Sequence, residues 1–134
     1  MKSVLVIDDE AAIRTVLKRV LEQAGHSVRL AANGAEGLAS LEEQTVDIVI
    51  TDIIMPMMHG VDAIKAIAQK FPAVRIVAIS GGGNFANADY QPNAIKTEAY
   101  LAAAKLAGAH AVLNKPFHTR DVLQAITTAT GSSD

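Results

Sequence analysis

The sequence predicts an α/β protein with a doubly wound, five-stranded parallel sheet, and the pattern of apolar residues carries this prediction. Short apolar runs alternate along the chain with segments whose apolar residues recur at helical spacing. Runs of this kind suit buried parallel strands, and right-handed crossovers place the intervening helices on both faces of the sheet. We expect the strand order 2-1-3-4-5, which puts the first and third strands side by side at the switch point.

The elements can be assigned in chain order. The first strand is Val4–Ile7, and a helix with apolar residues from Ile13 to Ala24 ends at Gly25, a residue type favoured after a helix end. The remaining expected elements are the strand His26–Leu30, a helix capped by Asn33 and running through Leu41, the strand Asp47–Thr51, a helix that opens after Gly60 and runs to Phe71, the strand Arg75–Ile79, the helix Ala99–Gly108, the strand Ala111–Leu113 and the helix Val122–Ala129. Together they make five βα units.

The length of 134 residues suits one domain, which we place at residues 1–130, followed by a short tail at 131–134. The segment at about 81–98 contains Gly81-Gly82-Gly83 and few periodic apolar positions, so it is expected to be a long loop. Loops of this length in compact domains are usually functional or mobile.

Composition excludes several classes of protein. The chain is 50% hydrophobic and 19% charged, with a net charge of -2 and no long basic run, so we expect no nucleic-acid partner. It has no cysteine that could form disulfides or thiolate metal sites, and its histidines are too scattered in the sequence to indicate a histidine metal site. No apolar stretch approaches the roughly 20 residues of a membrane span, so we expect a cytoplasmic protein without membrane association.

Polar residues follow four of the predicted strands. Asp8 and Asp9 come after the first strand, Asp52 after the third, Ser80 after the fourth and Lys115 after the fifth. Ligands of open α/β sheets bind outside the carboxyl ends of the strands, so these side chains are expected to meet at one site. A lone aspartate at a strand end is usually a cap or turn residue. Five polar residues that converge on one site, three of them aspartates, are not explained in that way.

Carboxylates packed together repel unless positive charge offsets them, and Mg²⁺ with Lys115 would supply that charge. In this hypothesis Asp9 is a direct ligand of Mg²⁺ and Asp8 acts through water. Asp52 and a backbone carbonyl just past it, that of Ile54, complete the metal shell. If Asp52 is the nucleophile toward a phosphoryl donor, Ser80 and Lys115 contact the transferred oxygens.

These residues resemble the response regulator receiver domain. The resemblance rests on Asp8-Asp9, on Asp52 with Met55-Pro56 and Gly60, on Ser80-Gly81, and on Lys115-Pro116-Phe117, and it covers nearly the whole chain. It implies a flavodoxin-like, CheY-like fold in which Asp52 is phosphorylated with Mg²⁺ by a sensor histidine kinase or phosphotransfer protein. It further implies self-phosphorylation and autodephosphorylation without turnover of an independent substrate.

The family signals through protein docking, so we expect an unknown downstream target on the face formed by the last two helices and the last strand. With no output domain in 134 residues, a stand-alone regulator that is a monomer or weak dimer is expected. Two departures affect the readout. Val112 stands where receivers often carry an aromatic switch residue, and the stretch between Ser80 and Lys115 is longer than usual.

Two other functions remain open. A Mg²⁺-dependent phosphatase of the haloacid-dehalogenase type also phosphorylates an aspartate, but it needs an Asp-x-Asp motif where this chain has Asp8-Asp9-Glu10. A constitutive interaction module would keep the receiver fold without using phosphorylation. Binding assays with and without phosphorylation distinguish this module from a switch.

Overall fold

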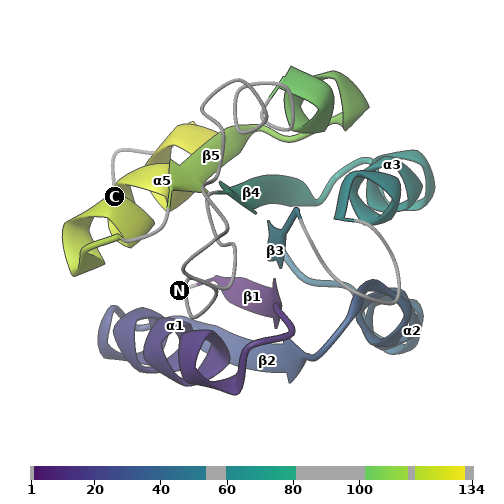
Figure 1. Cartoon of the computed structure of the whole chain (residues 1–134). Helices are drawn as coiled ribbons and strands as arrows, with labels where there is room; N and C mark the ends of the chain where they lie inside the picture. Colours follow the sequence, from purple (N-terminus) through teal and green to yellow (C-terminus); the bar gives the residue numbers. More distant parts are fainter. Residues whose placement is uncertain (1, 54–59, 81–101, 115–116, 132–134) are drawn as a thin grey trace, which may run out of the picture.

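The structure is a computed structural model that describes residues 2–53, 60–80, 102–114 and 117–131. Its strands form one parallel sheet in the order β2-β1-β3-β4-β5, with helices on both faces (Figure 1). The elements are β1 (Ser3–Ile7), α1 (Ala11–Gln23), β2 (Ser27–Ala31), α2 (Gly34–Glu43), β3 (Ile48–Asp52), α3 (Gly60–Lys70), β4 (Arg75–Ser80), β5 (Ala111–Asn114) and α5 (Thr119–Thr130). Residues 102–107 form a further helix. The predicted fold class and strand order are confirmed.

Two apolar layers bury the two faces of the sheet, because side chains alternate along each strand. Val4 and Val6 of β1 point into the layer beneath α1 and α5, whereas Leu5 and Ile7 point into the layer beneath α2, α3 and the helix at 102–107. The central strand β3 is buried along its whole length. This arrangement leaves the two ends of the sheet, not its faces, as the places where polar side chains can gather.

Local signals in the sequence set the helix ends. The Asn33 side chain accepts a hydrogen bond from the Glu36 backbone N–H at 2.9 Å, which caps α2 as predicted. Helix α5 begins at Thr119, earlier than expected, because the Asp121 carboxylate accepts the His118 backbone N–H at 2.8 Å and completes a polar first turn. It ends at Thr130 and is followed by Gly131, which has a positive φ of 69°.

A close contact between α2 and β1 lies next to the carboxyl end of β1. Gly37 of α2 is buried against Ile7, and an added Cβ would overlap Cδ1 of Ile7 and lie 2.9 Å from its Cγ1. Glycine at this position therefore lets α2 approach the end of β1, directly before Asp8.

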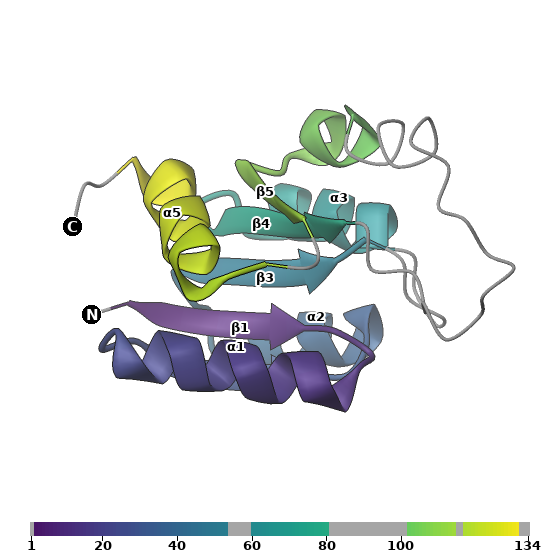
Figure 2. The same ribbon diagram turned by 60° about the vertical axis from the view of Figure 1, so that its left-hand side comes forward.

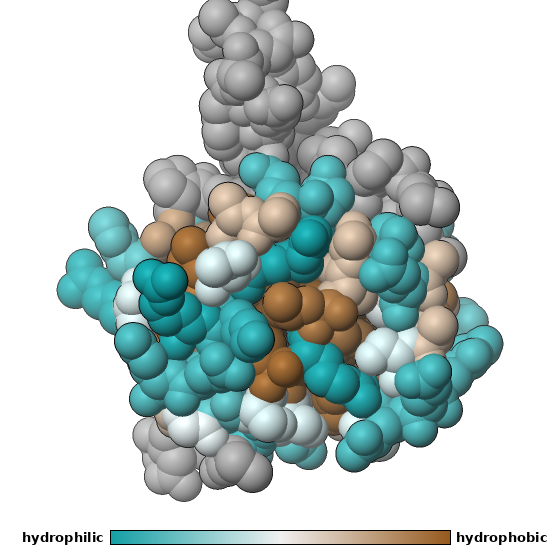
Figure 3. Space-filling model, turned by 90° about the horizontal axis from the view of Figure 1, so that it is seen from below, coloured by the Kyte–Doolittle hydropathy of each residue, from teal (hydrophilic) through white to brown (hydrophobic). Residues whose placement is uncertain are grey.

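The outer edge of β2 carries no neighbouring strand in the described residues, and Figure 3 shows the molecule from this side. A small hydrophobic area lies at the centre of this view within hydrophilic surface. Leu30 of β2 is 40% exposed, and the Arg29 side chain reaches across to donate to the backbone carbonyls of Ser40 and Gln44. In the part of the chain that the structure describes, no helix has the length and apolar character to cross a membrane.

Candidate functional site at the carboxyl edge of the sheet

The carboxyl ends of β1 and β3 bring the predicted carboxylates together. These strands are neighbours, and Ile7 pairs with Thr51, so Asp8 and Asp52 follow aligned positions. Asp8 is fully buried and Asp52 is 2% exposed, whereas Asp9 is exposed. Figure 2 shows these strand ends at the same side of the molecule. The predicted convergence of Asp8, Asp9 and Asp52 is therefore observed.

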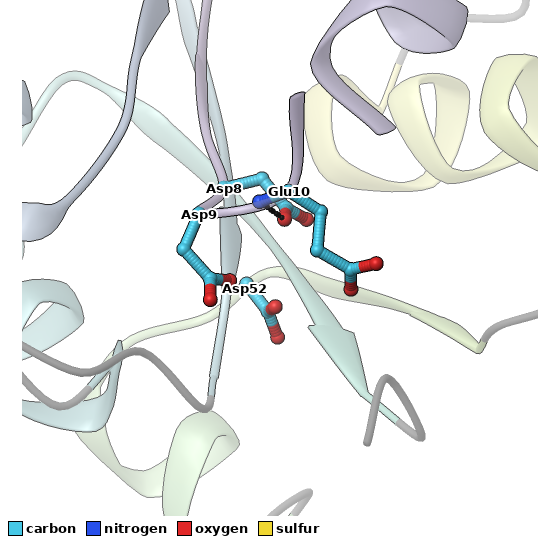
Figure 4. Close-up of side chains that lie close together, drawn as sticks. All are labelled: Asp8, Asp9, Glu10 and Asp52. Carbon is cyan, nitrogen blue, oxygen red and sulfur yellow. Dashed lines mark hydrogen bonds between the residues drawn. The ribbon is translucent and has the colours of Figure 1, made fainter. Parts of the chain in front are cut away.

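Hydrogen bonds to the neighbouring strand and to α1 hold Asp8 in place. Its backbone N–H donates to the Ala31 carbonyl of β2 at 3.1 Å, and its own carbonyl accepts from Arg14 Nη1 at 2.7 Å. Its carboxylate Oδ1 accepts the Glu10 backbone N–H at 2.9 Å (Figure 4). The turn between β1 and α1 is thus tied to the neighbouring strand and to α1, which limits the directions in which Asp8 and Asp9 can point.

Glu10 joins the cluster, and the sequence reasoning assigned it no role. One carboxylate oxygen from each of Asp8, Asp9, Glu10 and Asp52 lies within 4.8 Å of the others (Figure 4). Glu10 precedes α1 but makes no side-chain capping bond to that helix. Glu10 directly follows Asp8-Asp9 in the sequence, and a residue just past a strand end remains at the same edge of the sheet. This position could have indicated that Glu10 lies near the cluster.

The donor set fits a hard divalent cation. All four groups are carboxylates, which Mg²⁺ and similar ions prefer, and two of them are buried where water screens their mutual repulsion poorly. A cation at this position would offset that repulsion and could keep part of its water shell beside the exposed Asp9 and Glu10. The chemistry of the site is therefore that of a carboxylate cluster suited to binding a metal and a phosphoryl group.

The other predicted site residues are described only in part. Ser80 is the last residue of β4, adjacent to β3 through the pairing of Asp52 with Ile79, so its backbone lies at the same edge. Ile54, Lys115 and the predicted loop at 81–98 lie outside the described residues. The site thus includes the carboxylates and the end of β4.

The comparison with known families agrees with this geometry. Residues 4–127 match the family model described as the response regulator receiver domain. The chain belongs to this family. Receivers are the signalling switches of two-component systems, and the acidic residues of this receiver lie where such a switch has its phosphoacceptor site.

Individual relatives support the assignment over almost the full chain. The receiver is 36% identical over 126 residues to the chemotaxis protein CheY of Thermotoga maritima, covering 93% of this chain and 94% of that protein. It is 32% identical over 126 residues to the response regulator receiver protein CpdR of Brucella abortus, covering 94% of each. The solved structure of Vibrio cholerae CheY4 superposes with a TM-score of 0.79 at 27% identity, covering 96% of this chain and 98% of that one.

Val112, the residue expected at the place of an aromatic switch, is part of β5. It pairs with Ala78 of β4 and is half-buried against the apolar layer beneath α3. A β-branched side chain in a strand has few χ1 rotamers, so it cannot swing between a buried and an exposed position as a ring can.

Proposed function

We propose that this receiver is a phosphorylation-dependent switch in which Asp52 accepts a phosphoryl group from a sensor histidine kinase or phosphotransfer protein. An Asp52 carboxylate oxygen attacks the phosphorus of the phosphohistidine, a P–O bond forms, and the P–N bond breaks to release the imidazole. The observation that carries the proposal is the placement of Asp52, 2% exposed at the end of β3, within a cluster of three further carboxylates.

Mg²⁺ is the proposed cofactor, held by Asp8, Asp9, Asp52 and the backbone carbonyl of Ile54. When bound, the ion neutralises charge on the carboxylates and on the phosphoryl oxygens. Ser80 and Lys115 are proposed to contact the phosphoryl oxygens, since Ser80 is the last residue of β4 at this edge and Lys115 directly follows β5 in the sequence. The hydrogen bonds that hold Asp8 support the proposal because they fix the turn that carries two of the ligands.

We propose that phosphorylation changes the affinity of a downstream protein for a groove beside β5, between α5 and the helix at 102–107. The groove has a volume of about 490 Å³. Its lining comes from the helix at 102–107, β5 and α5, and comprises Lys105, His110, Ala111, Val112, Leu113, Asn114, Asp121, Gln124, Ala125 and Thr128. Asn114 ends β5 beside Ser80 of β4, so this groove reaches the strand ends that flank the phosphorylation site.

The test is uptake of one phosphoryl group from acetyl phosphate, measured as the mass of the intact protein. We expect one added phosphoryl mass with Mg²⁺ and little or none after chelation. The Asp52→Asn variant should gain none, whereas Asp62→Asn, which changes an exposed aspartate of α3, should behave as the unaltered protein. An adduct of equal yield in Asp52→Asn would refute the assignment.

We further propose that residues 1–130 form the receiver domain and that it turns over no independent substrate. Its only reactions would be self-phosphorylation and hydrolysis of its own aspartyl phosphate. A phosphatase would release many phosphates per protein molecule from a phosphomonoester, whereas the switch proposed here should release none. Steady release of phosphate from such a substrate, lost in Asp52→Asn, would favour the phosphatase instead.

A further inference from the structure

The strands of the sheet begin at the edge opposite the carboxylate cluster, which we call the amino edge. Side chains at this edge make hydrogen bonds to the backbone of neighbouring strands. There the residue just before a strand uses its side chain to accept a backbone N–H from the neighbouring strand segment. Asp47, before β3, accepts the Ser3 N–H at 2.9 Å, and its own N–H donates to the Ser3 carbonyl at 3.0 Å. This closed pair of bonds joins the start of β3 to the start of β1.

His110 makes the same closed pair between β5 and β4. Its Nδ1 accepts the Ile76 backbone N–H at 3.0 Å, and its own N–H donates to the Ile76 carbonyl at 2.8 Å. His26, before β2, makes the side-chain bond but not the closed pair: its Nδ1 accepts the Lys2 N–H at 3.2 Å, whereas its own N–H donates to the Leu21 carbonyl at 3.0 Å. A histidine therefore directly precedes each outer strand, whereas an aspartate directly precedes the central strand β3.

The histidine bonds require a neutral ring, because Nδ1 can accept only when it carries no proton. Protonation would place two donors against each other and leave the N–H of Ile76, a fully buried residue, without its acceptor. Burial, followed by the positive charge of Arg75, lowers the pKa of His110 below its ordinary value. Burial also lowers the pKa of His26, with smaller contributions from the amino terminus and Lys2.

The charged groups around His110 also oppose its protonation. Arg75 precedes Ile76 on β4, and Lys105 lines the same groove from the helix at 102–107. The acidic residue of that groove, Asp121, already accepts the His118 backbone N–H. Arg75 is therefore the charge that acts against protonation of His110, while Lys105 and Asp121 share the lining of the groove with it.

His110 also stands at a structural junction. The helix at 102–107 ends through hydrogen bonds from Gly108 and Ala109 to the Ala104 carbonyl, and His110 is the next residue before β5. Gly108 has a positive φ of 131°, and a Cβ there would lie 2.8 Å from that of Ala68, so this connection is tight. Losing the bond to Ile76 would loosen the start of β5 where it lines the groove.

We propose that His110 is an acid-sensitive latch, which holds the amino end of β5 against β4 while its ring is neutral and releases it when the ring is protonated. The proposal does not depend on phosphorylation. It predicts a local opening at one end of the groove under mild acid, with the carboxylate cluster at the other end of the sheet left in place.

The test is amide hydrogen exchange followed by NMR as the pH is lowered from about 7.5 through the range in which the His110 ring protons are seen to titrate. Protection of the Ile76 amide, normalised to the intrinsic rate at each pH, should fall by about fivefold or more, the equivalent of one hydrogen bond of roughly 1 kcal/mol. The midpoint should match that of the His110 ring protons. The Ile53 amide, which donates to the Ile79 carbonyl at the carboxyl edge, is the internal control and should not change.

The matched variant is His110→Asn, whose amide oxygen can accept the Ile76 N–H as Asp47 accepts that of Ser3, but does not titrate. Protection of Ile76 should then stay constant across the same pH range. A constant protection of Ile76 in the unaltered protein while the His110 ring titrates would overturn the proposal, and so would an equal fall in His110→Asn. If the variant does not fold, the measurement on the unaltered protein still decides.

Discussion

Two aspartates at opposite ends of one strand have opposite surroundings. Asp47, just before β3, is exposed and accepts hydrogen bonds from the backbone N–H and hydroxyl of Ser3. Asp52, the last residue of β3, is buried beside three further carboxylates. The first carboxylate is surrounded by donors and stabilises the fold. The second lies beside three further carboxylates, an arrangement suited to binding positive charge and a phosphoryl group.

The same contrast extends to the whole of the two edges. At the amino edge, three residues that precede strands satisfy backbone N–H groups with their side chains. At the carboxyl edge, side chains that follow strands gather like charges in one place. The difference separates residues that stabilise the fold from residues placed for chemistry, and substitutions at the two edges should therefore have different effects.

The largest effect is expected on metal binding. Asp9→Ala removes a proposed direct ligand and should weaken Mg²⁺ binding by at least about tenfold, measured by calorimetric titration. Glu10→Ala removes an exposed carboxylate of the same cluster and should weaken it by only about two- to fivefold. Equal losses in the two variants would contradict the ligand roles proposed for Asp9 and Glu10.

The next effect concerns the contact beneath the carboxyl edge. Gly37→Ala should destabilise the protein by about 1 kcal/mol in urea unfolding, because overpacking against Ile7 outweighs the better helix propensity of alanine. Ala39→Gly, at an exposed position of the same helix, reports the propensity term alone. A stabilised Gly37→Ala variant would show that Ile7 moves aside without cost.

Substitutions of Asp47, just before β3, and of Asp52, its last residue, should change the free energy of unfolding in opposite directions when no metal is present. Asp52→Asn removes one charge from the cluster and should raise the free energy of unfolding by up to about 1 kcal/mol. Asp47→Ala removes the acceptor of two hydrogen bonds and should lower it by about 0.5–1 kcal/mol. Loss of stability in both variants, measured by the same unfolding assay, would remove the contrast between the edges.

The smallest effect is a pH dependence at the amino edge. The hydrogen bond donated by the Ser3 backbone N–H holds the pKa of Asp47 below its ordinary value. Because the folded state binds this proton less readily, the stability from Asp47 is present above the unfolded pKa of about 4 and is lost as the pH falls through the folded value. The acid unfolding curve of Asp47→Asn should lack this contribution, and an unchanged curve would contradict it.

The carboxyl edge was largely predictable from the sequence, because it depends on two regular features. The apolar runs gave the strands, and the strand order placed β1 beside β3, so Asp8, Asp9 and Asp52 had to meet. Glu10 was missed because its side chain direction depends on the turn before α1, not on any periodic pattern. The start of α5 was missed for a similar reason, since its first turn is polar and is fixed by Asp121.

The amino edge could not be predicted to the same degree. Each of its hydrogen bonds joins residues far apart in the sequence, such as His110 with Ile76, and exists only when the strand register is known. In the sequence, His26 and His110 were simply scattered histidines. Their role follows from their position before the two outer strands of the sheet.

The role proposed for Asp52 can be tested by locating the phosphoryl group itself. After phosphorylation with Mg²⁺ and acetyl phosphate, borohydride reduction converts an aspartyl phosphate to homoserine, which peptide mass spectrometry can assign to a position. We predict homoserine at position 52 and at none of the positions of Asp8, Asp9 and Asp47. Homoserine at one of those positions, with Asp52 unmodified, would contradict the account.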